Sequence, residues 1–342
     1  MAKEIRRQIV NRKFAPGEKL PNREEMRQHF GSTAATIQRA FDQLQAEGFV
    51  VAKGRAGTFV ADFPPHLCHY GLVLSEHSGS LVRPYMWLVL EAQAMELARK
   101  AGPMRRFSVF HMPSNAASIS HYHALTELIQ NDGLAGLIFA SLPHTMEGSV
   151  VLDHPGIPRV VISSVPEYGE CGLIRLHGQL SLALDYLKSR GRRRIALLVS
   201  PVFQGLDRFA ELLAERGMTT EARWQQAIHY STEPRLVYNV VRLILHGKVD
   251  DRPDGLIIAD DNVVEAATRG ILESGVNVPQ DMDVVAHANF PLPTPSMVPA
   301  KRIGFDMRQI LSSGIGWIDA ARRGDRPPKS MDIGAISDDQ VV

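Results

Sequence analysis

Residues 21–50, PNREEMRQHFGSTAATIQRAFDQLQAEGFV, predict two short helices separated by a tight turn. Asn22 is a favoured helix-capping residue and Glu25 follows three positions later, so the pair predicts a capping box at the start of the first helix. Gly31 predicts the end of that helix, and Thr33 predicts the cap of the next one. The order is therefore helix, turn, helix.

The flanking segments complete a small domain. Residues 2–12 place apolar side chains at helical spacing and predict a short first helix. Residues 49–53 and 58–61, FVVAK and TFVA, predict two strands, and residues 54–57 predict a hairpin with a basic tip. Three helices followed by a β-hairpin are typical of a winged helix-turn-helix, whose third helix enters the major groove of DNA.

The expected recognition helix carries polar side chains opposite its apolar stripe. Gln38 has an amide that pairs with an adenine edge, and Arg39 can reach guanine or phosphate. Thr33 and Thr36 suit phosphates near the amino terminus of the helix, although a simple capping role for Thr33 is an equal alternative. The other expected DNA contacts are basic residues of the preceding helix and of the wing, namely Arg23, Arg27, Lys53 and Arg55.

These motifs resemble the gluconate-repressor (GntR) family of regulators. The resemblance covers nearly the whole domain through APGEKLP at 15–21, FGSTAATIQRAFDQLQAEGFV at 30–50 and GTFVA at 57–61. It implies double-stranded operator DNA as a partner. Residues 22–24 are Asn-Arg-Glu where relatives carry Ser-Glu-Arg, and Ala34 stands where they carry Arg, so a relative's operator sequence does not transfer to this chain.

Length and composition indicate a globular protein of two or three domains. The 342 residues are 44% hydrophobic and 22% charged, without an apolar run of about eighteen residues. The start, MAKEIRRQIV, lacks the apolar core of a secretory signal, so we expect a cytoplasmic protein with no membrane partner. The net charge is +4 over residues 1–62 and −3 over residues 63–342, so only the first part complements a polyanion.

The sequence gives no sign of a metal or cofactor. Cys68 and Cys171 lie far apart, without a CxxC or Cys/His ligand spacing, and are expected to be structural thiols. His121 and His123 are one residue apart, and on a helix such side chains point in different directions. We therefore expect neither a metal site nor a cofactor.

A second domain is expected after a hinge linker at residues 63–68. From residue 69 to residue 342 apolar strand patterns alternate with helical ones, which predicts an α/β fold with parallel sheets that bind ligands beyond the carboxyl ends of their strands. The strands are expected at 69–74, 106–111, 135–140, 159–163, 194–199, 255–259 and 283–287.

This region resembles the periplasmic-binding-protein-like sensor of the lactose and galactose repressor (LacI/GalR) family. The motifs are YGLVLS at 70–75, DGLAGLIFAS at 132–141, LDYLKSRGRRRIALL at 184–198, DGLIIADDNVVEAA at 254–267 and GVNVPQDMDVVAHANF at 275–290. The resemblance implies a two-lobed, type I Rossmann-like domain with a sugar-sized ligand between the lobes. Lobe 1 is expected at about 69–163 and 292–320, and lobe 2 at about 164–291 and 321–342.

Polar residues that follow the strands are the candidate effector contacts, namely Ser75, Glu76, Ser141, Asp261 and Asn289. Asp261 is the leading candidate because the resemblance implies that it binds ligand hydroxyls; the alternative is a helix cap at the start of residues 262–274. Arg83 is also expected near the effector, in an aromatic wall with Tyr85 and Trp87, or else in packing at a lobe or dimer surface.

Several polar positions of the family are replaced here. Leu176 and His177 stand where relatives carry Asp-Asn, Ala288 replaces the Asp of a Gly-Phe-Asp phrase, and Gly205 takes the place of an arginine. A less polar ligand, a phosphorylated or modified sugar, a ligand other than a sugar, and a degenerate pocket all remain open.

The expected protein is a DNA-binding transcriptional regulator, a homodimeric repressor of carbohydrate-metabolism genes with a small-molecule effector. A GntR-type head on this sensor is similar to the arabinose-repressor (AraR-like) arrangement. The sequence contains no GxSxG, HExxH, GxxxxGK[ST] or GxGxxG motif of the kinds found in enzymes. No catalytic residue is therefore expected. The alternative is a solute-binding protein of the periplasmic-binding type without specific DNA binding.

Overall fold

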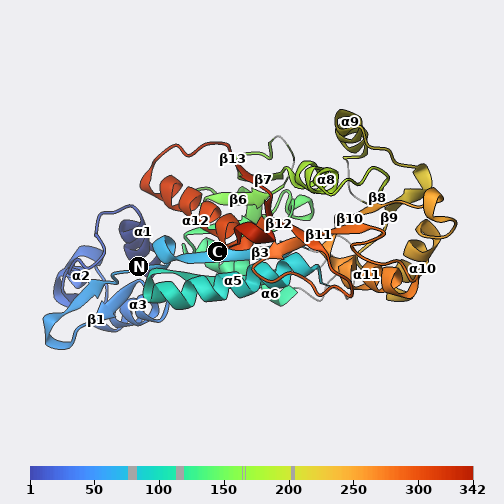
Figure 1. The fold of residues 1–342 in the computed structure, drawn as a ribbon. Coiled ribbons are helices and arrows are strands. Elements are labelled where there is room, and N and C mark those ends of the chain that lie inside the picture. The colour runs from blue at the N-terminus through green and yellow to red at the C-terminus, as the bar shows by residue number, and fades with distance from the viewer. Residues whose placement is uncertain (76–82, 113–118, 164, 166, 202–204, 342) are drawn as a thin grey trace. The chain divides into compact units, whose positions relative to one another are not determined.

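The computed structural model describes residues 1–75, 83–112, 119–163, 165, 167–201 and 205–341 (Figure 1). The chain divides into two compact units. The first contains Met1–Gly79, Ala94–Ile174 and Ser312–Met331, and the second contains Ser80–Gln93, Arg175–Leu311 and Asp332–Val342. Among the helices of these described segments, none has both the length and the apolar character needed to cross a membrane.

The amino-terminal domain is the predicted winged helix-turn-helix. Its elements are α1 (Ala2–Val10), α2 (Arg23–Phe30), α3 (Ala34–Ala46), β1 (Val50–Ala52) and β2 (Thr58–Val60), the blue segments of Figure 1. Asn22 Oδ1 accepts from the Glu25 amide at 2.9 Å, and Glu25 Oε2 accepts from the Asn22 amide at 2.8 Å, so the capping box is confirmed. Ile5, Ile37 and Leu44 are fully buried in the core of this domain.

The expected hinge is an ordered segment that contains a short helix, α4 (Pro65–Cys68). Proline disrupts a helix interior, but it is favoured in the first helical turn, where its missing N–H costs nothing. His66 is buried, and its ring stacks on that of Phe49 with a centroid distance of 5.8 Å. Burial and the nearby Arg322 and Arg12 lower the pKa of His66 to about 4. The linker is therefore packed against the winged helix-turn-helix rather than freely exposed.

The first six-stranded sheet has the order β13-β7-β6-β5-β3-β4. Its strands are β3 (His69–Ser75), β4 (Arg106–Met112), β5 (Gly136–Phe139), β6 (Arg159–Ile162), β7 (Gly172–His177) and β13 (Ser330–Gly334). The associated helices are α5 (Tyr85–Ala101), α6 (Ile119–Gln130), α7 (Val150–Asp153) and α12 (Met307–Arg323). Leu137 and Phe139 pack with Leu125 of α6 on one face, and Ile138 approaches Gly314 of α12 on the other.

The second sheet has the order β14-β12-β11-β10-β8-β9. Its strands are β8 (Ile195–Val199), β9 (Gln225–Ala227), β10 (Gly255–Ile258), β11 (Asp283–Phe290), β12 (Lys301–Asp306) and β14 (Ile336–Ser337). The helices are α8 (Gln179–Ser189), α9 (Leu206–Arg216), α10 (Pro234–Ile244) and α11 (Val264–Glu273). Ile257 packs with α8 and α9, whereas its neighbour Ile258 packs with α10 and α11, so helices cover both faces.

The strands assigned to each sheet differ from the expected lobe boundaries. β7 pairs in parallel with β6, so the first sheet continues past residue 163. β12 pairs in parallel with β11, so residues 301–306 lie in the second sheet and not with the segment 292–320 assigned to lobe 1. Both strands contain polar residues, and their membership is decided by pairing with a distant strand, which the local pattern does not encode.

Candidate functional site

Helix α3 presents one polar face to solvent. Ile37, Phe41 and Leu44 are buried in the domain core, whereas Thr33, Thr36 and Arg39 are exposed and Gln38 is half-buried. Thr33 is also the helix cap, because its side chain accepts from the Thr36 amide at 3.3 Å. The predicted recognition face is therefore accessible, and the capping and DNA-facing roles of Thr33 are compatible.

Several of the proposed DNA contacts have partners within their own helices. Gln38 Nε2 donates to Asp42 Oδ1 at 2.6 Å, and Arg27 Nη2 donates to Glu24 Oε1 at 2.6 Å. The Arg27–Glu24 pair is exposed and Gln38 is half-buried, and pairs at such surface positions contribute little to stability because water screens them. Phosphate or base contacts can replace them at small cost.

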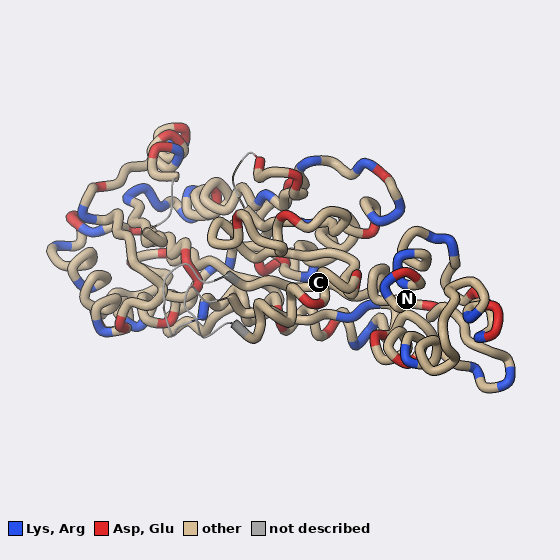
Figure 2. The backbone as a smooth tube through the Cα atoms, turned by 180° about the vertical axis from the view of Figure 1, so that it is seen from behind, with Lys and Arg blue, Asp and Glu red and all other residues tan. Residues whose placement is uncertain are grey.

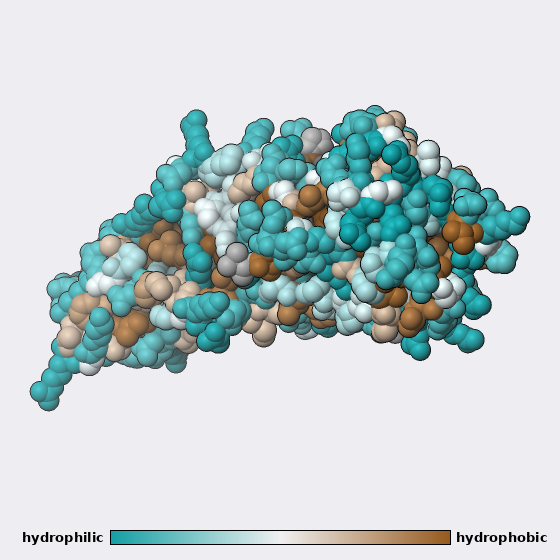
Figure 3. Space-filling view, viewed as in Figure 1, coloured by the Kyte–Doolittle hydropathy of each residue, from teal (hydrophilic) through white to brown (hydrophobic). Residues whose placement is uncertain are grey.

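The wing carries its basic residues at the tip of the hairpin. Lys53 and Arg55 are exposed there. Figure 2 shows basic residues at this end of the hairpin, and the extreme tip, at the lower left of Figure 3, is hydrophilic. Lys53 Nζ lies 4.8 Å from the centroid of the Phe59 ring, which orients its side chain. Within the described parts of the chain, Arg23, Arg39 and Arg55 form no ion pair, so their charges are available to a polyanion.

Arg6 is a basic residue of this domain that cannot serve as a DNA contact. It is 1% exposed, and its Nε donates to Glu47 Oε2 at 3.1 Å, which joins α1 to the end of α3. Its Nη1 donates to Asn131 Oδ1 at 3.1 Å. Sequence reasoning missed this role because Arg6 sits beside Arg7 in a basic, amphipathic helix and only packing distinguishes the two.

In the second unit, Asp261 and Asn289 form one polar cluster at the carboxyl ends of β10 and β11. They are 3% and 1% exposed, and Asn289 Nδ2 donates to Asp261 Oδ2 at 2.5 Å. Asn289 Oδ1 is buried and forms no hydrogen bond of ordinary geometry among the described residues, although the Asn289 side chain interacts with His287. The fold thus brings together two residues that are 28 positions apart, both at the carboxyl ends of parallel strands, where such sheets bind ligands.

The Asp261 carboxyl is poorly suited to carry a charge in this environment. Burial raises its pKa first, and the neighbouring charge of Asp260 raises it further, to about 7. The hydrogen bond from Asn289 acts in the opposite direction and is outweighed. An approaching hydrogen-bond donor would stabilise the carboxylate form.

The residue that caps the following turn is the neighbour of Asp261, not Asp261 itself. Asp260, not Asp261, caps the following turn, since its Oδ1 accepts from the Asn262 amide at 3.0 Å. Asn262 Nδ2 donates to Asp260 at 2.6 Å, and its Oδ1 accepts from the Tyr85 amide at 2.7 Å. The carbonyl oxygen of Asp261 accepts from Thr294 Oγ1 at 3.0 Å. The adjacency of Asn262 to the Asp pair was visible in the sequence, whereas the loop that carries Thr294 gave no signal.

The remaining candidates lie elsewhere. Ser75 ends β3 and Ser141 follows β5, so both lie at the carboxyl edge of the first sheet, where β3 and β5 pair in parallel. Glu76 lies outside the described residues. Arg83 is exposed, whereas Trp87 is 4% exposed and belongs to the core rather than to an open aromatic wall.

The two cysteines are free thiols, and burial raises the pKa of each. Over the described ranges, no three His, Cys, Asp or Glu side chains are arranged to hold a metal ion.

Two family models match the two regions of the chain separately. Residues 1–60 match the model for bacterial regulatory proteins of the gntR family, and residues 184–330 match the periplasmic binding protein-like domain. An arabinose metabolism transcriptional repressor of Geobacillus stearothermophilus is 23% identical over 313 residues, which cover 87% of this chain and 83% of the relative.

Solved structures match the fold of the larger region. A regulatory protein of the LacI family from Chloroflexus aggregans aligns with a TM-score of 0.62 at 16% identity, over 79% of this chain and 96% of that one. A LacI family transcriptional regulator from Arthrobacter sp. FB24, in complex with lactose, aligns with a TM-score of 0.59 at 17% identity, over 79% and 97% of the two chains.

The class of protein follows from these findings. The chain joins a GntR-type winged helix-turn-helix to a periplasmic-binding-protein-like domain with the fold of LacI-family regulators. It is a DNA-binding transcriptional regulator and not an enzyme. The relatives that match along most of its length are arabinose metabolism repressors.

Proposed function

We propose that this protein is a repressor of carbohydrate-metabolism genes that responds to a sugar or sugar derivative. The exposed polar face of α3 supports the DNA-binding role. The names of the full-length relatives support repression of sugar genes, and the arabinose repressor from Geobacillus makes a pentose the first effector to test.

The observation that carries the effector role is the buried Asp261–Asn289 cluster. Asn289 Oδ1 is a buried acceptor that forms no hydrogen bond of ordinary geometry among the described residues, although its side chain interacts with His287, and Asp261 is a carboxyl with a raised pKa. A polyhydroxylated ligand supplies O–H donors to both groups and so removes the cost of an unsatisfied acceptor. Ser75, Glu76, Arg83 and Ser141 are proposed as further contacts, with Asp261 and Asn289 at the centre of the site.

We further infer a cytoplasmic homodimer that binds a near-palindromic operator, because two identical heads related by twofold symmetry match two half-sites. Gln38 and Arg39 are proposed to contact base edges in the major groove, and the phosphates are proposed to be bound by Thr33, Thr36, Arg23, Arg27, Lys53 and Arg55. The effector changes the relative placement of the two heads by favouring one conformation of the sensor.

Electrophoretic mobility shift tests this proposal. Genomic fragments that include the protein's own promoter are titrated with the full chain, with and without L-arabinose and a panel of sugars and sugar phosphates. A sequence-specific complex whose affinity changes with one sugar is expected in the wild type, and the same complex without the response is expected in Asp261→Ala. If the wild-type protein forms no sequence-specific DNA complex at moderate salt, the result would instead favour a solute-binding protein.

A further inference from the structure

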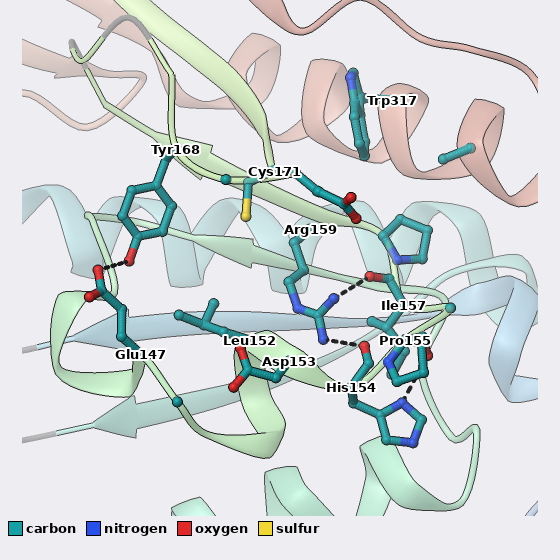
Figure 4. Close-up of a pocket in the computed structure, with 16 residues that line it drawn as sticks. Glu147, Leu152, Asp153, His154, Pro155, Ile157, Arg159, Tyr168, Cys171 and Trp317 are labelled. Carbon is teal, nitrogen blue, oxygen red and sulfur yellow. Dashed lines mark hydrogen bonds between the residues drawn. The ribbon is translucent and has the colours of Figure 1, made fainter.

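A cavity of about 780 Å³ lies in the first unit (Figure 4). Its lining residues come from the segments before β6 and β7 and from Trp317 and Ala321 of α12. The cavity is therefore at the amino edge of the sheet, whereas Ser75 and Ser141 lie at its carboxyl edge. It is a separate site that the sugar-sensing role does not use.

Aromatic and apolar side chains form much of its wall, and two rings are held in fixed positions. Trp317 Nε1 donates to the Pro328 carbonyl at 2.7 Å, and the indole packs so closely on Gly172 that a Cβ there would lie 2.4 Å from the ring. The Tyr168 hydroxyl donates to Glu147 Oε1 at 2.9 Å, as Figure 4 shows. Fixed rings of this kind bind a ligand without a further loss of side-chain freedom.

The charge of the cavity is negative. Asp153 and Glu170 line it at exposed positions and form no hydrogen bond or ion pair within the described ranges, although both lie in the electrostatic field of Arg159; Glu147 is already bound by Tyr168 and His144. The cationic side chain in the lining is Arg159, at the centre of Figure 4. Uncommitted carboxylates beside aromatic faces favour a positively charged ligand.

Arg159 attracts both carboxylates electrostatically but donates a hydrogen bond to neither, because its guanidinium is bound to the loop before β6. Each of its three nitrogens donates at 2.8 Å to a backbone carbonyl, those of Val151, Ile157 and His154. The guanidinium thus fixes the shape of the loop that forms one wall. Asp153 and Glu170 can therefore still accept hydrogen bonds from a ligand.

We infer that this cavity binds an organic cation, a primary or quaternary ammonium compound with an apolar body. The ammonium group pairs with Asp153 and Glu170, and the apolar body packs on Trp317 and Tyr168. The site is independent of the DNA-binding face and of the Asp261–Asn289 cluster.

Isothermal titration of the full-length protein with phenethylamine tests the inference, with 2-phenylethanol as a neutral ligand of nearly the same shape. Phenethylamine, protonated at neutral pH, is expected to bind saturably and to quench tryptophan fluorescence. Trp317→Phe is expected to remove the quenching. The neutral alcohol is expected to bind at least about tenfold more weakly, since it cannot pair with the carboxylates.

The matched variants separate charge pairing from folding. Asp153→Asn with Glu170→Gln keeps the shape of both side chains and is expected to raise the Kd for phenethylamine about tenfold. Asp250→Asn with Glu273→Gln makes the same two changes at exposed positions of the second unit and is expected to leave the Kd unchanged. Equal binding of the amine and the alcohol, equal effects of the two double variants, or no saturable binding of the amine would each overturn the inference. None of these results bears on the response of the DNA complex to sugars.

Discussion

The side-chain amide of Asn289 donates a hydrogen bond to the carboxyl of Asp261, although both residues are almost fully buried and lie on different segments of the second unit. Burial and Asp260 together hold the pKa of Asp261 at about 7. The pair therefore links the proposed effector site to the protonation state of one carboxyl.

Asp261→Asn is expected to change how stability depends on pH. Between the ordinary pKa of 3.8 and the raised value of about 7, the folded protein binds a proton at Asp261 that the unfolded chain does not. In the wild type, the contribution of Asp261 to the free energy of unfolding is therefore present at low pH. It falls as the pH rises through this window, by at most about 1.4 kcal/mol per pH unit. Urea unfolding of the wild type and the variant across this range measures the difference.

Comparison with the wild type is needed because three histidines, buried His66 and half-buried His69 and His287, act in the opposite direction. His66, His69 and His287 have pKa values lowered to about 4, so each makes the protein more stable as the pH rises from about 4 to 6.5. The contributions of His66 and His69, which lie in the first unit, are common to both proteins and cancel in the difference, whereas His287 interacts with Asn289 and is part of the same cluster as Asp261. If the two stability curves run parallel, Asp261 does not titrate in this range.

Gln38→Ala and Lys53→Ala are expected to weaken DNA binding in different ways. Gln38 reads a base edge in our proposal, so its loss relaxes the sequence preference by about 1–3 kcal/mol at one position. Lys53 contacts phosphate in the same proposal, so its loss weakens binding to all sequences alike. It also reduces the slope of log K against log salt concentration by about one. Binding to operator variants at several salt concentrations distinguishes the two. Lys248→Ala, an exposed lysine of the second unit, is the control.

Arg6→Met is expected to destabilise the amino-terminal domain by about 2–4 kcal/mol, because it leaves Glu47 without its partner in a largely buried position. Arg7→Met changes an arginine whose side chain is 67% exposed and is expected to cost less than about 1 kcal/mol. The double variant Arg6→Met with Glu47→Met removes both charges and should recover much of the loss. Equal losses in the two single variants, measured by chemical denaturation, would contradict the role of Arg6.

Gly304→Ala is expected to destabilise the second unit by about 1–3 kcal/mol or more. A Cβ at Gly304 would lie 1.8 Å from the Ala288 carbonyl oxygen, and paired backbone in β11 and β12 cannot move aside. Gly316 lies in α12 with nothing within 4 Å of its added Cβ, so Gly316→Ala should instead stabilise the protein by about 1 kcal/mol through helix propensity. Thermal unfolding of both variants tests the opposite signs, and a shift of the same sign in both would count against this packing.

The order of elements in the amino-terminal domain was predictable because its signals are local. The capping residues Asn22 and Thr33 and the apolar spacing of α3 fix the helices within a few residues of each other along the chain. The same holds for β10 and β11, which are continuous apolar runs, and for the polar residues that follow them.

Contacts between distant segments required the tertiary structure. The sequence alone determined the winged helix-turn-helix, the alternation of strands and helices, and the crevice candidates Asp261 and Asn289, since each rests on spacing or on the end of a strand. Only the fold decided that β7 and β12 join their sheets, that Arg6 is buried while Arg7 is not, and that a negatively charged cavity forms beside Trp317. The reason is that pairing, burial and electrostatic environment depend on which surfaces meet, and a linear pattern specifies only the surfaces.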